Sequence, residues 1–271
     1  LNMWTPSVGT VTGPAQYIAK YAPYPEDLSI FSFTSYNDTT IDNTSYNAYV
    51  VGMSTSKSMP SAVIFPFEYK NKPVTKILGS SLNSSYSSYR SSVTNAYIPE
   101  TIHSISDYAF YYCTNLKELN IPSSVHSIVG TQIFRYTGIS KIIAPGCQTF
   151  GCTLRSQYGP CYNMSSLEYV ILGSKEYPFK KMEYNSSNSN YAIFASCDKL
   201  KFVNLVTENG LRSDVTFSAN ESYNGSVNYI FSKEPVKLED INGVNYALIN
   251  DEWHVLGLSD DTLTEVTIQD T

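Results

Sequence analysis

The sequence carries little charge for its length, and that charge is not concentrated anywhere. Asp, Glu, Lys and Arg make up 15% of the 271 residues, the net charge is −6, and no basic run exceeds the pair Lys180-Lys181. Proteins that bind nucleic acids place a basic surface against the phosphate backbone. The sequence therefore predicts no nucleic-acid partner.

Long hydrophobic runs are also missing. No uninterrupted apolar stretch reaches the roughly 18 residues typical of a transmembrane helix, so no membrane span is predicted in this chain. The chain begins at Leu1 without a charged-then-apolar leader, which fits either a signal segment removed beforehand or a start inside a longer protein. With 42% hydrophobic residues, the chain can still build a sizeable core.

Cysteine is scarce, and the five present cannot all pair with one another. Cys113 and Cys197 each lie three residues after a phenylalanine and three before a leucine, so they are predicted to be small buried hydrophobes at one repeat position. Cys161 precedes Leu167 by the same number of residues as Phe110 precedes Leu116, so Cys161 is predicted to lie in the core as well. Cys147 and Cys152 remain; they could form a small disulfide loop in an oxidising compartment, whereas zinc is less favoured because no histidine lies nearby.

What the sequence has instead is a repeat. The segment IPETIHSISDYAFYYCTNLKELN, which starts at Ile98, recurs 23 residues later as IPSSVHSIVGTQIFRYTGISKII, which starts at Ile121. Less regular copies occur near Val63 before it, and near Leu167 and Leu200 after it. Because a unit this short cannot bury its own apolar face, the fixed period predicts that the units stack as a solenoid.

Each unit is predicted to contribute one strand, one turn and one short convex element. Along Leu116–Ile121 apolar and polar residues alternate as in a half-buried strand, and Pro122 ends it. The segment around Phe134 suits a short helix or a 3₁₀ turn. Insertions are predicted at Tyr184–Asn190 and Glu208–Gly225, which have loop composition.

The two ends of the chain are predicted to carry hairpins. We expect an N-terminal segment with a β-hairpin cap over residues 1–60 and the repeat array with its insertions over residues 61–230. Residues 231–271 are predicted to form a second cap-like hairpin and the start of a further repeat, because Val255–Ser259 resembles Val50–Ser54. Asn250-Asp251 fits the turn of that hairpin.

The pattern IPxxVxxIxxxAFxxCxxLxxLxIP over Ile98–Pro145 resembles the BspA-like leucine-rich repeat family of bacterial cell-surface proteins. The likeness is weaker over Ser61–Ile77 and Leu167–Leu205, and Ile133 and Thr137 replace the alanine and cysteine of the family pattern. The resemblance implies an α/β repeat: a right-handed leucine-rich repeat solenoid, β-rich, with short helices or 3₁₀ turns on its convex side and an N-terminal β cap. It also implies an exported protein, extracellular or on the cell surface, that binds rather than catalyses.

The best candidates for ligand binding are the residues predicted to point outward from the stacked strands on the concave face. Several are large and apolar, and such residues with polar neighbours are typical of binding sites. An alternative is that inserted loops cover some of them. The predicted binding residues are Asn95, Tyr97, Glu118, Asn120, Lys141, Ile143, Tyr169, Ile171, Phe202 and Asn204.

No enzyme, metal or cofactor is predicted. The sequence has no Gly-x-Ser-x-Gly elbow, no His-Glu-x-x-His and no phosphate-binding glycine loop. His103 and His126 lie one lap apart, but no carboxylate or cysteine completes a metal site. We therefore expect a protein that binds a host or neighbouring-cell protein or glycan; a polysaccharide-binding module and a passive spacer in a larger surface protein are the alternatives.

Overall fold

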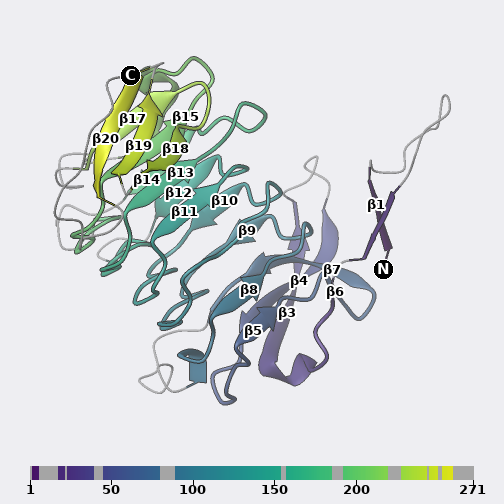
Figure 1. The fold of residues 1–271 in the computed structure, drawn as a ribbon. Coiled ribbons are helices and arrows are strands. Elements are labelled where there is room, and N and C mark those ends of the chain that lie inside the picture. Colours follow the sequence, from purple (N-terminus) through teal and green to yellow (C-terminus); the bar gives the residue numbers. More distant parts are fainter. Residues whose placement is uncertain are drawn as a thin grey trace.

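The computed structural model describes residues 2–5, 18–21, 23–39, 45–79, 89–153, 157–184, 192–218, 227–242, 244–249 and 252–258. These residues form mainly strands, with 3₁₀ turns at η1 (Leu28–Ile30) and η3 (Arg212–Asp214) and a helical turn at Tyr89-Arg90. The laps stack one on another from β3 to the C-terminal strands (Figure 1). At the N-terminus, β1 (Asn2–Thr5) and β2 (Ile18–Tyr21) pair with each other. No helix in these ranges is both long and apolar enough to cross a membrane.

One side of every lap is a strand or bridge of a parallel ladder, here called the first ladder. Its strands are β5 (Ala62–Ile64), β8 (Asn95–Tyr97), β11 (Lys141–Ala144), β13 (Tyr169–Leu172), β15 (Phe202–Val206) and β17 (Tyr229–Ser232). A single bridge pairs Tyr97 of β8 with Asn120 in the next lap, and β11 then begins the four-stranded part of the ladder. Lys141 lies opposite Tyr169, which in turn lies opposite Phe202. This register confirms the predicted equivalence of these positions.

The second side of each lap is another parallel ladder, which the sequence analysis did not predict. Its strands are β4 (Tyr46–Met53), β7 (Lys72–Ile77), β9 (Ser104–Ile105), β10 (Ser127–Val129), β12 (Thr149–Cys152), β14 (Lys181–Tyr184) and β16 (Thr216–Phe217). At its N-terminal edge β3 (Phe31–Asp38) pairs antiparallel with β4, and β6 (Glu68–Tyr69) pairs with β7. From β9 onward the strands of this ladder have only two to four residues, so their sequences are too short to show the alternation of apolar and polar residues that indicates a strand.

The third side of each lap is a turn, and it too is hydrogen-bonded to the next lap. The amides of Phe110, Phe134 and Cys161 donate to carbonyls of the following lap at 2.9, 2.9 and 3.2 Å. The segment around Phe134 is an irregular turn, not the predicted short helix or 3₁₀ turn. Left-handed backbone at Tyr112 and Tyr136 (φ 63° and 62°) interrupts any helix there. The chain has a β-rich repeat fold, and the α/β description was wrong for this side.

The core is a column of side chains contributed by successive laps. The rings of Phe110 and Phe134 stack with centroids 5.9 Å apart, and both are fully buried. Cys161 occupies the same position in the next lap, as predicted, because its amide makes the equivalent inter-lap hydrogen bond. All five cysteines are buried and free, so the disulfide loop considered for Cys147 and Cys152 is not formed.

Three antiparallel strands follow the first ladder: β18 (Lys237–Ile241), β19 (Val244–Ile249) and β20 (Glu252–Leu258). The strands β19 and β20 pair antiparallel in the region where the C-terminal hairpin is predicted. Its proposed turn, Asn250-Asp251, lies outside the described residues, as do most of the predicted insertion at 184–190, part of the second at 208–225, and the further repeat expected after residue 258.

Replacing Phe134 with alanine should lower the free energy of unfolding by about 3–5 kcal/mol, since a phenylalanine truncated inside a packed core leaves a cavity. Urea unfolding followed by circular dichroism measures the change. Leu211→Ala, at a side chain that is 56% exposed, is the control and should change the free energy by less than about 0.5 kcal/mol. A loss below 1 kcal/mol for Phe134→Ala would contradict the stacked core.

The thiols should be unreactive in the folded protein at pH 8. Burial raises the pKa of Cys113, Cys147 and Cys197 to about 12, and only the thiolate reacts with DTNB. We expect no rapid labelling of the native chain and five thiols per chain after unfolding in urea without reductant. Three thiols after unfolding would show that Cys147 and Cys152 are paired after all.

Candidate functional site

The uncovered part of the first ladder presents two outward positions per lap. Side chains alternate along a strand, so Ile142 is buried between its exposed neighbours Lys141 and Ile143. The two preceding laps repeat this arrangement, with Ala96 and Leu119 each lying between two exposed neighbours. We call the exposed set the open face; its members are Asn95, Tyr97, Glu118, Asn120, Lys141 and Ile143. Six of the ten predicted binding residues thus lie together on one exposed surface.

The open face is hollowed between laps. A shallow depression of about 450 Å³ is lined by Glu118, Asn120, Lys141 and Ile143 together with residues from the lap corners. A second, of about 440 Å³, adjoins it at Glu118 and extends over Asn95. The corner residues of the two depressions are Thr94, Asn115, Lys117 and Ser140. None of these four is among the predicted binding residues: Thr94, Asn115 and Ser140 lie outside the predicted strands, and Lys117 lies outside the row of positions expected to point outward.

A third depression lies at the N-terminal end of the same ladder. Its volume is about 550 Å³, and its lining includes Ala62 and Ile64 of β5, Ile30 of η1 and the exposed ring of Tyr24. The Tyr24 hydroxyl donates to the carbonyl of Glu68 at 3.0 Å, which fixes the ring at the edge of the depression. The outward row of the first ladder therefore remains accessible from Ala62 to Ile143.

The other four predicted binding residues are not exposed, so that expectation was wrong. Tyr169, Ile171, Phe202 and Asn204 are between 0% and 4% exposed. The first three form an apolar cluster with Ile230, Val236, Ala247 and Leu238. The cover seen among the described residues comes from the C-terminal sheet and the residues that lead into it, whereas the inserted loops considered as an alternative lie largely outside the described residues.

Asn204 fixes the start of this cover. Its Nδ2 donates to the carbonyl of Ile230 at 3.1 Å and to the Ser232 hydroxyl at 2.8 Å, and its Oδ1 accepts from the Val236 amide at 3.0 Å. A buried amide with donors and acceptor all in use is stable in the interior. These contacts make Asn204 a structural residue that holds the turn between β17 and β18.

Lys141 lies where the open face meets the covered part. Its ammonium is 5.7 Å from the ring centre of the buried Tyr169, and the ammonium of Lys201 is 5.3 Å from the same ring. Lys201 also pairs with Glu168 at 3.2 Å. Burial raises the pKa of Tyr169, although its hydrogen bond to Lys201 opposes the rise. Lys141 belongs to the open face and, unlike Lys201, forms no ion pair with a carboxylate among the described residues.

The structure places His103 and His126 in adjacent laps but gives no support to a metal site. The amide of His126 donates to the His103 carbonyl at 2.9 Å, and the His126 Nδ1 lies 3.1 Å from the Gly146 carbonyl. Burial lowers the pKa of His103, with the Asp38 charge opposing this effect. No group of three metal-ligating side chains occurs within the described residues.

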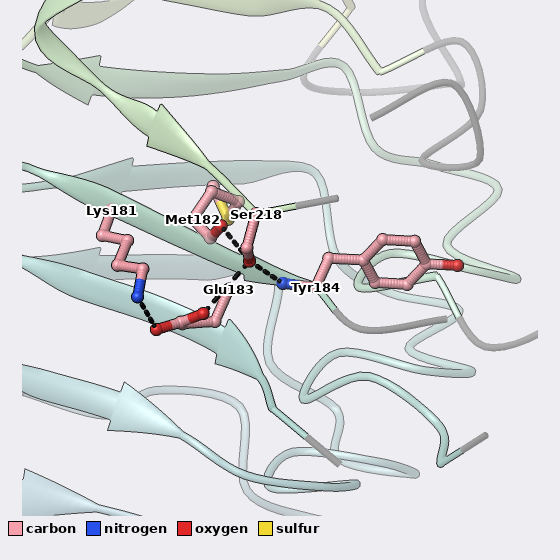
Figure 2. Close-up of polar contacts among 5 residues, drawn as sticks. All are labelled: Lys181, Met182, Glu183, Tyr184 and Ser218. Atoms are coloured by element: carbon pink, nitrogen blue, oxygen red, sulfur yellow. Dashed lines mark hydrogen bonds and ion pairs between the residues drawn. The ribbon is translucent and has the colours of Figure 1, made fainter. Parts of the chain in front are cut away.

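A polar cluster on the second ladder is also structural. Figure 2 shows Lys181 paired with Glu183 at 2.5 Å, and the Ser218 hydroxyl 3.1 Å from both Glu183 Oε2 and the Met182 carbonyl. The Ser218 hydroxyl also accepts from the Tyr184 amide at 2.8 Å. These contacts occupy the hydroxyl, so the cluster joins β14 to the chain after β16 and offers no activated nucleophile.

Comparisons with known proteins agree with this architecture. A family model described as a BspA type leucine-rich repeat region, in six copies, matches residues 81–220, just over half of the chain. No curated protein matches the sequence.

Three solved bacterial structures are similar. The leucine-rich repeat protein TpLRR of T. pallidum is 15% identical, with 70% of this chain and 84% of that chain covered and a TM-score of 0.42. A leucine-rich repeat protein of Bacteroides ovatus is 21% identical over 64% and 45%, with a TM-score of 0.30. A leucine-rich cell surface protein of Faecalibacterium prausnitzii is 16% identical over 82% and 61%, with a TM-score of 0.32.

Asn204 and Asn120 hold the same ladder position, so replacing each with alanine separates a buried asparagine from an exposed one. Asn204→Ala should destabilise the protein by about 2–3 kcal/mol, because the partners of its amide are left unsatisfied. It should also speed amide hydrogen exchange in β18 and β19. Asn120→Ala should leave both stability and exchange unchanged. Equal effects of the two changes would refute the proposed anchoring by Asn204.

Proposed function

This chain belongs to the BspA-type leucine-rich repeat family, and on that premise we propose that it recognises a macromolecule through its open face. Members of repeat families present extended surfaces that act in binding, and their repeats contact only their neighbours in the stack. The family supports a surface or interaction role for the chain as a whole. The open face is the part of the first ladder that remains available for that role.

The observation that carries this proposal is a pair of exposed apolar side chains in one row. Tyr97 is 38% exposed and Ile143 is 47% exposed, and Asn120 stands between them. Neighbouring strands are about 4.8 Å apart, so the two lie about 10 Å apart across two laps. Glu118 and Lys141 supply charges beside them. An apolar pair with a polar rim is the arrangement found at binding hot spots.

We place this binding outside the cell, either in the extracellular space or on the cell surface. The F. prausnitzii structure is described as that of a leucine rich cell surface protein. Low charge and many uncharged polar side chains also suit a surface that makes hydrogen bonds rather than ionic contacts. The partner we propose is a host or neighbouring-cell protein, bound without any catalytic step.

The organisation of the chain is part of the same proposal. Residues 1–60 would carry the β cap, with β3 and β4 covering the first lap, residues 61–230 the right-handed repeat array, and residues 231–271 the second hairpin and the start of a further repeat. The antiparallel pairing of β3 with β4 at the edge of the second ladder supports the cap. The last part is supported by the hairpin of β19 and β20.

A polysaccharide is the second candidate ligand of the open face. The depression over Asn95 is lined by the side chains of Asn115, Thr94, Lys117 and Glu118, which suit the hydroxyl groups of a sugar. Tyr97 offers a ring for stacking beside it. In the third reading, the array is a passive spacer and the open face binds neither protein nor sugar.

The experiment measures how the labelled full chain binds to cultured epithelial cells or to neighbouring bacteria. The double variant Tyr97→Ala/Ile143→Ser should bind at least tenfold more weakly than the unchanged chain, or not at all. The reason is that both apolar anchors are lost while the fold is kept. Val255→Ser is the matched control, because Val255 is also 47% exposed but lies on β20. It should leave binding unchanged.

The same labelled proteins on a glycan array would separate the candidate ligands. Selective binding to sugars that is lost in the double variant would favour the polysaccharide reading over a protein partner. If cell binding survives the double variant, or falls equally with Val255→Ser, the open face is not the binding site. Absence of binding to cells and glycans alike would favour the spacer.

A further inference from the structure

A cluster of tyrosines surrounds one arginine on the turn side of the laps, away from the open face. The Arg135 guanidinium carbon lies 4.5 Å from the ring centre of Tyr136, 4.7 Å from Tyr162, 5.2 Å from Tyr158 and 5.9 Å from Tyr111. These residues come from three successive laps. We call Arg135 and these four tyrosines the tyrosine cage.

The charge of Arg135 is not matched by an acid. One terminal nitrogen donates to Gln132 Oε1 at 2.5 Å and the other to the Tyr136 hydroxyl at 2.7 Å, so both partners are neutral. Among the described residues no carboxylate forms an ion pair with Arg135. Asp107, one lap earlier in the chain, accepts instead from the Thr131 amide at 2.8 Å. Arg135 keeps part of its surface accessible, so a positive charge remains available inside an aromatic surround.

Two tyrosines of the cage, Tyr111 and Tyr162, stay neutral at physiological pH. Burial raises the pKa of Tyr111 to about 12, against the opposing effect of the Arg135 charge. Burial likewise raises the pKa of Tyr162. Their hydroxyls therefore remain protonated and can both donate and accept hydrogen bonds, while Arg135 supplies the charge.

The backbone beneath the cage is strained where tyrosines occupy it. Tyr112 and Tyr136 have left-handed backbone, with φ of 63° and 62°, and the equivalent turn residues of the next laps are Asn163 and Ser196, at 58° and 57°. Asparagine tolerates this conformation, whereas it is unfavourable for a bulky side chain. The rings of Tyr112 and Tyr136 lie 4.8 Å apart. Strained residues tend to occur at functional sites, and here the strain is found where rings are added beside Arg135.

We propose that the tyrosine cage binds the carboxylate of an acidic sugar, a uronic or sialic acid unit of a glycan. Guanidinium groups bind carboxylates through paired hydrogen bonds. Aromatic rings pack against the apolar faces of sugar rings, and tyrosine hydroxyls suit the sugar hydroxyls. An acidic peptide would offer the same carboxylate, but it has no ring to place among four tyrosines; this difference favours the sugar.

Isothermal titration of the full chain with a tetrasaccharide of alternating glucuronic acid and N-acetylglucosamine, and with sialyllactose, tests this site. The controls are the carboxyl-reduced tetrasaccharide, lactose and a glutamate-rich peptide. We expect at least one acidic sugar to bind at least tenfold more tightly than its neutral counterpart and more tightly than the peptide, and binding to weaken as salt rises. Equal binding of acidic and neutral sugars, preference for the peptide, or no binding would overturn the proposal.

Variants of the cage show whether Arg135 and its tyrosines act directly. Arg135→Gln should reduce the affinity for the acidic sugar at least tenfold. Tyr136→Asn introduces the residue found at the equivalent position 163, so it should keep or raise the unfolding temperature and still weaken binding. Ser196→Asn, at the same turn position outside the cage, should leave binding unchanged. Undiminished affinity in a folded Tyr136→Asn or Arg135→Gln variant would show that the sugar binds elsewhere.

Discussion

Each lap of this chain can bury its apolar residues only against the laps on either side of it. A lap of about two dozen residues has too little surface to form a core alone. The stack solves this with backbone hydrogen bonds on all three sides of a lap: the first ladder, the second ladder, and the turns at Phe110, Phe134 and Cys161. These bonds do not depend on side-chain identity. A phenylalanine and a cysteine can therefore occupy the same core position.

The same constraint leaves the outward side chains free to differ between laps. An apolar residue facing outward can remain exposed, as Tyr97 and Ile143 do, or be covered by another part of the chain. Tyr169 and Phe202 are covered by the C-terminal sheet, and Asn204 supplies the buried polar contacts that hold that cover. The proposed binding surface is therefore bounded by a second structural element, which leaves exposed only the laps before β13.

The sequence predicted the features that depend on one lap or on the repeat. Its period aligned Lys141, Tyr169 and Phe202 correctly. It did not locate β17, and the strand that it predicted along Leu116–Ile121 is only a bridge at Asn120. It did not reveal the second ladder, since a strand as short as Ser104–Ile105 shows no alternation. Nor could it distinguish a covered outward residue from an exposed one, because Tyr169 and Tyr97 follow the same local pattern and differ only in tertiary contacts.

The sequence did not predict the tyrosine cage, because the cage also depends on contacts between laps. Arg135 meets Tyr111, Tyr158 and Tyr162 only because neighbouring laps place the same turn side by side. No single lap contains the arrangement.

The turn backbone accepts asparagine at position 163 and tyrosine one lap earlier, so the turn can exchange side chains while its inter-lap hydrogen bonds persist. The first ladder has the same freedom on its own side of the lap. Because backbone hydrogen bonds maintain the stack on both sides of a lap, the side chains of the open face and those of the tyrosine cage can change independently. The binding proposed for one surface therefore need not constrain the binding proposed for the other.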